Sequence, residues 1–189
     1  TTCRRQRQMC IRDSLIIMAA GVSSRMKKSS SSQNMSKTQL DQSNKRMKGF
    51  IQVGEGMEPL IYYIIKNAIS AEINNFYIII SDDSKDFQEY LKSLENKLGI
   101  YLKFAFQDFY GQVKPSGTSD AIFQTMNQYK ELMKTRFLVC NCDNLYSSKA
   151  MEILKRENNY NSMIAYDYEC LDFSNERLSS FSILKIKNN

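Results

Sequence analysis

Three short, uninterrupted apolar segments constrain the fold of this chain more than any other feature. Residues 15–19 (LIIMA), 76–80 (FYIII) and 137–140 (FLVC) each have the length of a strand and carry no charge. A strand that faces solvent on one side alternates apolar and polar residues, whereas a parallel strand covered on both faces is apolar throughout. These segments therefore predict buried parallel strands.

Segments with helical spacing lie between and after these runs. Residues 59–71, 84–98, 118–129 and 147–156 place apolar side chains three or four positions apart, and the first of them opens on a proline. Proline is favoured at the first position of a helix, and this apolar spacing forms one face of it. Each segment is therefore predicted to be a helix that covers the sheet.

Three further segments are predicted as strands. Residues 100–106 and 162–166 are rich in aromatic and branched side chains, and residues 180–186 alternate as an edge strand would. Strands that alternate with helices indicate an α/β fold. We expect a Rossmann-like three-layer sandwich with a mostly parallel central sheet.

Two polar segments fall outside this pattern. Residues 1–14 lack an apolar period and stop where the first apolar run begins, so we interpret them as a non-native or disordered leader. Residues at about 27–46 include four consecutive serines. They are expected to form a flexible polar insertion, or a mobile flap, because they follow closely on Gly21. Residues 15–189 are expected to form one domain.

Composition narrows the classes of function. The chain is 42% hydrophobic and has a formal net charge of +6, but its lysines and arginines are scattered among acids. A nucleic-acid-binding surface gathers them on one face, so no nucleic-acid partner is expected.

No apolar run is long enough for a membrane span, and no signal peptide is recognisable, which favours a cytoplasmic protein. There is no histidine, and Cys140 and Cys142 lack zinc-ligand spacing, so we expect them to be buried.

The end of the first predicted strand is a candidate phosphate-binding loop. Ala19, Ala20 and Gly21 are small enough for the backbone to lie against a flat ligand, and glycine permits unusual dihedral angles. The following backbone N–H groups and the Arg25 guanidinium could bind phosphate oxygens. The loop lacks the second and third glycines of a dinucleotide fingerprint, and the sequence lacks the G-K-[ST] of a P-loop.

Polar residues follow another predicted strand. In an open parallel sheet, ligands bind beyond the carboxyl ends of the strands. Gln107 comes directly after residues 100–106, and its amide can pair with the edge of a nucleobase. Residues 114–121 (KPSGTSDA) place a proline and a glycine before the next helix, whose first N–H groups suit a base carbonyl. A helix capped by Thr118 or Ser119 is the alternative.

An acidic residue follows the third apolar run. Asp143 lies in residues 141–146 (NCDNLY), where a carboxylate is costly unless it is paired or binds a metal. Mg²⁺ held by a carboxylate and substrate phosphates fits this position. A cap for the helix after Ser147 is the alternative.

Taken together, these motifs resemble the sugar-phosphate nucleotidyltransferase superfamily, the NDP-sugar pyrophosphorylase group. Residues 15–26 (LIIMAAGVSSRM) are similar to its first strand and A-A-G-x-G-[ST]-R-[ML] loop, with Ser23 where a second glycine is usual. Lys48 in MKGFIQVG resembles the lysine that follows this loop. PSGTSDA resembles the P-x-G-T-x-x-A segment, and NCDNLY the N-x-D-[DN] metal element.

The resemblance implies transfer of a nucleoside monophosphate from a nucleoside triphosphate to a sugar 1-phosphate or similar phosphorylated acceptor, with release of pyrophosphate. Catalytic roles would fall to Arg25 and Lys48, and Asp143 would bind Mg²⁺ as the cofactor. The nucleotide-binding residues implied are Ala19, Ala20, Gly21, Ser23, Ser24, Arg25, Gln107, Pro115, Gly117 and Thr118.

The resemblance also implies a fold of the nucleotide-diphospho-sugar transferase type that is truncated at the C-terminus, because the acceptor-binding part of the family normally lies further on. Two alternatives are a non-catalytic nucleotide-binding or regulatory module and a nucleotide-sugar-dependent glycosyltransferase. The latter would be expected to carry a D-x-D pair, whereas Asp143 stands between Cys142 and Asn144. The sequence fixes neither the base, the acceptor nor the oligomeric state.

Overall fold

The computed structural model describes residues 14–20, 48–80, 85–112, 115–157, 161–179 and 181–184. Residues 1–13 of the expected leader, the loop at 21–26 and the insertion at 27–46 lie outside this part of the chain. Ser14, the last residue of the expected leader, is instead buried at the start of the first strand. For Lys48, the backbone is described and the side chain is not.

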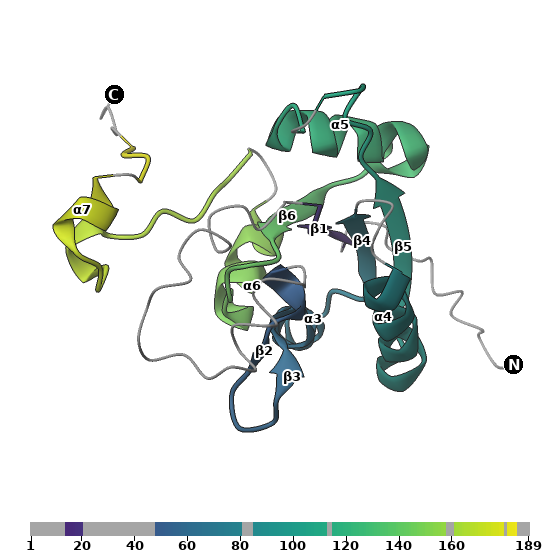
Figure 1. Cartoon of the computed structure of the whole chain (residues 1–189), viewed down its shortest axis with the longest axis horizontal. Coiled ribbons are helices and arrows are strands. Elements are labelled where there is room, and N and C mark those ends of the chain that lie inside the picture. Colours follow the sequence, from purple (N-terminus) through teal and green to yellow (C-terminus); the bar gives the residue numbers. More distant parts are fainter. Residues whose placement is uncertain are drawn as a thin grey trace, which may run out of the picture.

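A parallel sheet in the order β5-β4-β1-β6 forms the centre of the structure (Figure 1). Ile17 of β1 lies opposite Ile78 of β4 and Cys140 of β6. These central residues are apolar because helices cover both faces of the sheet, as the uninterrupted apolar runs predicted. The strands are β1 (Ser14–Met18), β4 (Asn75–Ile80), β5 (Tyr101–Phe106) and β6 (Phe137–Asn141).

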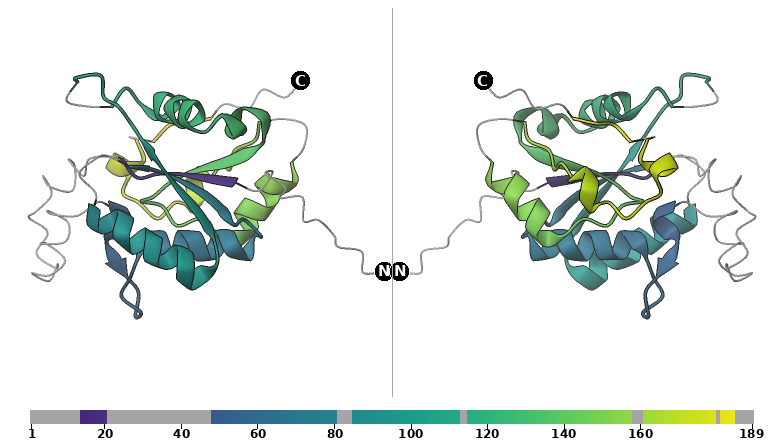
Figure 2. Two further views of the ribbon diagram at one scale, coloured as in Figure 1. Left: turned by 90° about the vertical axis from the view of Figure 1, so that its right-hand side faces the viewer. Right: turned by 90° about the vertical axis from the view of Figure 1, so that its left-hand side faces the viewer.

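Helices form a layer on each side of this sheet (Figure 2). Helices α3 (Leu60–Ser70), α4 (Lys85–Leu98) and α6 (Ser148–Arg156) bury apolar side chains against one face. Helix α5 (Thr118–Gln128) and the 3₁₀ helix η2 (Lys130–Lys134) cover the other face. This arrangement confirms the expected three-layer α/β fold. No helix in the described part of the chain has the length and apolar character needed to cross a membrane.

The order of the strands reverses beside β1. From β1 the chain runs outward to β4 and then β5 on one side, and it returns to place β6 on the other side of β1. The outward connections carry α3 and α4, and the return carries α5 on the opposite face. In open α/β sheets such a reversal leaves a crevice at the carboxyl ends of the strands.

Two predicted strands are wrong, and a small hairpin was not predicted. Residues 161–167 are irregular, and so are residues 181–184 of the expected edge strand. A strand needs a partner for its backbone groups, and side-chain composition alone does not supply one. The hairpin pairs β2 (Gln52–Val53) with β3 (Glu58–Pro59), so Pro59 ends a strand immediately before α3.

A charged cluster joins η2 to the sheet. Lys103 Nζ lies 2.6 Å from Glu131 Oε1, which also accepts a hydrogen bond from the Tyr77 hydroxyl at 3.1 Å. The same ammonium lies over the rings of Tyr77 and Tyr129, 5.4 and 5.1 Å from their centroids. The hydrogen bond from Lys103 holds the pKa of Glu131 below its ordinary value.

We expect Glu131→Gln to lower the free energy of unfolding at pH 7 by about 0.5 kcal/mol, a small amount because the ion pair is partly exposed. A carboxyl with a lowered pKa in the folded state stabilises the fold above its unfolded pKa and loses this effect as the pH falls. The difference in stability between the variant and the native protein in urea denaturation should therefore shrink as the pH falls through the folded-state pKa of Glu131.

Glu152→Gln is the matched control, because Glu152 is similarly half-buried but lies 3.8 Å from the exposed Arg156 one turn along α6, a longer and weaker pair. Its effect should be smaller at pH 7. A Glu131→Gln deficit that persists in acid would show that the charge of this carboxylate is not its source.

Candidate functional site

A cavity of about 300 Å³ lies at the carboxyl edge of the sheet, beneath the N-terminus of α5. Its walls come from the ends of β1, β4, β5 and β6 and from the first turn of α5. The lining residues are Met18, Ala20, Ile79, Gln107, Pro115, Gly117, Thr118, Ala121, Asn141, Cys142 and Asp143.

Backbone hydrogen bonds continue past the ends of the strands and align this edge. Ala19 N–H donates to the Ile79 carbonyl at 2.8 Å, and Gln107 N–H donates to the Ile80 carbonyl at 3.3 Å. On the other side of β1, Cys142 N–H donates to the Met18 carbonyl at 3.2 Å. The residues that leave the strands therefore emerge side by side at one level.

The alternation of side chains along β1 continues past its end, so the two alanines that follow the strand point to opposite faces of the sheet. Ala19 is buried in the core on the α3 face of the sheet, whereas Ala20 packs on the α5 face. Successive residues of an extended chain point to opposite faces. Of the two, only Ala20 lines the cavity.

The N-terminus of α5 opens onto the cavity without a side-chain cap. Gly117 occupies the N-cap position at φ 126°, a conformation that side-chain-bearing residues rarely adopt. The expected alternative, a cap by Thr118 or Ser119, is therefore wrong. The first N–H groups of a helix have no partner within the helix, so Gly117 and Thr118 bring hydrogen-bond donors to the cavity.

The edge backbone of β5 is bracketed by two glutamines of α5. Gln128 accepts from Phe106 N–H at 2.9 Å and donates to the Phe106 carbonyl at 2.7 Å. Gln124 accepts from Asp108 N–H at 2.7 Å and donates to the Asp108 carbonyl at 3.0 Å. These pairs hold the backbone on both sides of Gln107. The two glutamines act only through this tertiary contact, so no local pattern in the chain indicates their role.

Asp143 lies in a turn that is anchored on both sides. Cys142 is buried, and the Tyr146 carbonyl accepts a 2.8 Å hydrogen bond from the Asn67 side chain of α3. The cap of α6 is Ser147, whose hydroxyl accepts from Ala150 N–H at 3.1 Å. The alternative interpretation of Asp143 as that cap is therefore wrong. The exposed side chain of Asp143 lines the cavity.

The 3₁₀ helix η1 (Lys48–Phe50) packs against the end of β6 through a glycine. A Cβ atom at Gly49 would lie 3.1 Å from Cys142 Cβ and 3.3 Å from its Sγ. The close approach places the backbone of Lys48 one residue from a wall of the cavity. Gly49 was not predicted as a site residue, although its position directly after Lys48 was a signal.

Cys140 and Cys142 are buried, as predicted, and neither forms a disulfide. Burial raises the pKa of the Cys140 thiol to about 12, so it is protonated at neutral pH. Within the described residues, no group of three or more Cys, Asp or Glu side chains is gathered that could hold a metal ion.

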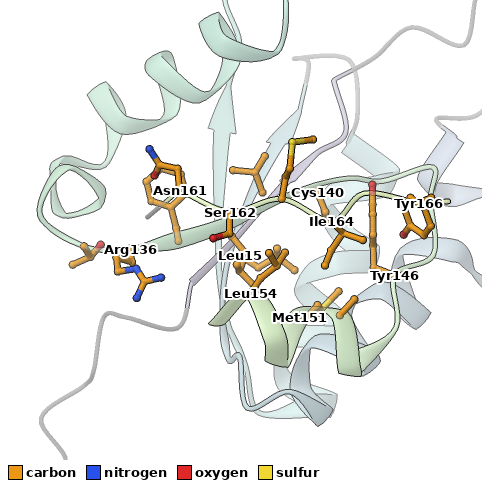
Figure 3. Close-up of a pocket in the computed structure, with 16 residues that line it drawn as sticks. Leu15, Arg136, Cys140, Tyr146, Met151, Leu154, Asn161, Ser162, Ile164 and Tyr166 are labelled. Atoms are coloured by element: carbon orange, nitrogen blue, oxygen red, sulfur yellow. The ribbon is translucent and has the colours of Figure 1, made fainter. Parts of the chain in front are cut away.

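A larger cavity of about 630 Å³ runs along the outer edge of β6 (Figure 3). Met151, Leu154 and Ile164 line it with apolar side chains, with Arg136 towards one end and Tyr166 towards the other. None of the described residues that line it is a carboxylate, and none of them comes from the carboxyl ends of β4 and β5. The smaller cavity is the better candidate because the polar residues of several strand ends meet there.

The structure thus gathers many of the expected site residues and leaves others aside. Those that line the cavity are Ala20, Gln107, Pro115, Gly117, Thr118 and Asp143. Ala19 faces the opposite core. The roles of Gly21, Ser23, Ser24 and Arg25 stay predictions, because these residues lie outside the described part of the chain. Asn141, Cys142 and Ala121 also line the cavity and were not predicted.

A doubly wound α/β sheet with a cavity where the strand order reverses defines a protein class that binds ligands at this edge. The family model described as nucleotidyl transferase matches residues 15–186, and the chain belongs to that family. A search of curated proteins gave no match.

Two solved structures share the fold. A UDP-glucose pyrophosphorylase complexed with UDP-glucose is 18% identical over 76% of this chain and 52% of its own, with a TM-score of 0.52. The inositol-1-phosphate CTP transferase from T. maritima is 14% identical over 78% of this chain and 50% of its own, also with a TM-score of 0.52. The chain therefore spans about half the length of these structures.

We expect Gly49→Ala to lower the free energy of unfolding by about 1 kcal/mol, because the added methyl group overpacks the contact with Cys142. Adding Cys142→Ala should relieve only part of this loss, since the nearest atom is the Cys142 Cβ. Chemical denaturation of the two variants measures both effects.

Gly56→Ala is the control, because a Cβ there would meet only the Tyr63 hydroxyl at 3.4 Å. A Gly49→Ala protein as stable as this control would contradict the close packing of η1 on β6.

Proposed function

We propose that this chain binds the donor nucleotide of a nucleotidyltransferase, which transfers a nucleoside monophosphate from a nucleoside triphosphate to a sugar 1-phosphate or similar phosphorylated acceptor. The main observation in support of this proposal is that Ala20, Gln107, Gly117 and Asp143, which come from separate segments of the chain, line one cavity. Membership of the family supports the reaction type. The printed names of the two similar structures, a UDP-glucose pyrophosphorylase and an inositol-1-phosphate CTP transferase, support the class of substrates.

One side of the cavity suits a nucleobase. Met18, Ala20 and Ile79 supply an apolar floor against which a flat ring can lie. The amide of Gln107 and the N–H groups at the start of α5 supply hydrogen-bonding partners for its edge. Apolar contact with a few placed polar groups is typical of sites for small ligands.

The opposite side suits phosphates and a divalent cation. Asp143 is an exposed carboxylate at the cavity, and such an oxygen ligand fits Mg²⁺, which often takes one or two carboxylates together with substrate phosphates. When bound, Mg²⁺ would neutralise charge on the triphosphate. The backbone of Lys48 lies beside this wall, and the predicted phosphate ligands Gly21, Ser23, Ser24 and Arg25 directly follow Ala20 in the sequence.

The proposed reaction needs no covalent intermediate on the protein. An oxygen of the acceptor phosphate forms a bond to the α-phosphorus, and the bond from that phosphorus to the bridging oxygen of pyrophosphate breaks. Positioning and charge neutralisation are the main requirements of such a transfer. The residues proposed here are of these two kinds: Gln107 and Gly117 position the base, and Arg25 and Lys48 neutralise phosphate charge. A cytoplasmic location stays a prediction, and thiols that form no disulfide, such as those of Cys140 and Cys170, are typical of that compartment.

Asp143→Asn should remove the Mg²⁺-dependent part of nucleotide affinity, because an amide is a poorer ligand for a hard cation than a carboxylate. Calorimetry with each nucleoside triphosphate, with and without Mg²⁺, measures this part separately from binding of the base. Pyrophosphate release with a panel of sugar 1-phosphates should fall at least about a hundredfold in the same variant.

Asp172→Asn is the matched control, because it removes an exposed carboxylate that does not line the cavity. If Asp143→Asn binds and turns over like this control, the proposed metal position is wrong. Circular dichroism of both variants separates a local effect from loss of the fold.

Arg25→Ala should weaken tripolyphosphate binding by about tenfold, because a guanidinium forms charge-assisted hydrogen bonds to phosphate oxygens. Inorganic tripolyphosphate contains no base, so its affinity reports on the phosphate side alone. Unchanged affinity would remove Arg25 from the site, whereas the thermal stability of the free protein should not differ from that of the native chain.

A further inference from the structure

Gln107 contacts a carboxylate that the proposed function does not use. Gln107 Nε2 donates to Asp120 Oδ2 at 3.3 Å, across the space between the end of β5 and the first turn of α5. Gln107 itself lines the cavity, whereas Asp120 does not. Asp120 therefore contacts Gln107, the residue proposed to pair with the base, but does not line the place where the base would bind.

The position of Asp120 is set by a second amide whose orientation is determined. Gln124 is 8% exposed and faces both backbone groups of Asp108, with Oε1 towards the N–H and Nε2 towards the carbonyl. Reversing this amide would place like groups together at both contacts. Its Nε2 therefore also faces Asp120 Oδ2, to which it donates at 2.8 Å.

This network determines the orientation of the Gln107 amide. A carboxylate accepts hydrogen bonds and cannot donate them, so it pairs with Nε2 and repels Oε1. With the amide turned over, Oε1 of Gln107 would face Asp120 Oδ2, and the contact would be repulsive. The backbone of Gln107 is held as well, because Gln128 and Gln124 bracket its two neighbours in the chain.

We propose that Asp120 is a positioning residue that determines base specificity by fixing the Gln107 amide in one orientation. A glutamine that turns over freely exchanges its donor and acceptor, and can pair with bases that present opposite patterns. A glutamine held by a carboxylate offers one pattern, so a base with the wrong pattern loses a hydrogen bond. This inference rests on the proposed function, in which the cavity takes a nucleobase.

The test is Asp120→Asn in the full chain. Asparagine can donate or accept, so it tolerates both orientations of the Gln107 amide. Calorimetry with the four ribonucleoside triphosphates in excess Mg²⁺ gives the ratio of the weakest (largest) to the tightest (smallest) dissociation constant. This ratio should shrink by about tenfold in the variant, while the affinity for tripolyphosphate stays within about twofold.

The control is Asp86→Asn, which also removes a carboxylate from the first turn of a helix but at α4. Its ratio should equal that of the native protein. If Asp120→Asn does not fold by circular dichroism, Asp120→Ser repeats the test with a smaller group that also donates and accepts.

The outcomes separate this inference from the proposed function. Asp120→Asn or Asp120→Ser with an unchanged ratio overturns it, even if all four affinities fall together. A native protein that binds all four triphosphates equally also overturns it, while triphosphate binding stands. A native protein that binds no triphosphate overturns the proposed function and this inference with it.

Discussion

The pairing of β1 with a parallel strand on each side is the constraint on which the rest of the structure depends. Ile16 and Ile17 are fully buried between β4 and β6, and helices cover both faces of the sheet. Parallel strands in one sheet end at one edge, so the segments that follow them meet there. A shift of β1 by one residue would exchange the faces of Ala19 and Ala20 and turn the wrong side chain to the cavity.

The two sides of the cavity are held by different forces. Neutral hydrogen bonds from Gln124 and Gln128 fix the β5 edge, where each bond stabilises the fold by only about 1 kcal/mol but fixes a direction. The Asp143 side is held by the packing of Gly49 on Cys142 and by the bond from Asn67 to the Tyr146 carbonyl. The hydrogen-bonded side is therefore suited to recognising the donors and acceptors of a base. The side with the exposed carboxylate is suited to binding a cation and the phosphates.

The sequence predicted the strands whose composition follows from burial. It did not predict the features that depend on contacts between distant segments of the chain. Residues 15–19 and 76–80 were recognisable because a strand covered on both faces is apolar throughout. Residues 137–140 do form a parallel strand, but the expectation that it is buried was wrong for most of it, since only Cys140 is buried and Val139 is exposed at the edge of the sheet. Residues 162–166 have similar composition but form no ladder, since pairing depends on a neighbour as well as on composition. Ala20, Gln107 and Asp143 could be placed at the site because each lies one or two residues beyond the end of a strand of a parallel sheet.

The remaining contacts could not be read from the chain. Gln124 and Gln128 are four residues apart on α5, a spacing typical of an ordinary polar helix face, and they bracket β5 only because α5 lies along its edge.

The direction of α5 also gives Asp120 a local role, since a carboxylate in the first turn is favoured by the helix dipole. Near a triphosphate the same charge would be repulsive. The donors of Gln107 and Gln124 offset this, because they hold the carboxylate on the β5 side of the cavity, where it serves as a hydrogen-bond acceptor. Asp143 has the opposite surroundings, with its exposed carboxylate on the far wall. The different placement of these two acids, rather than their residue type, is what fits one for orienting an amide and the other for binding a cation.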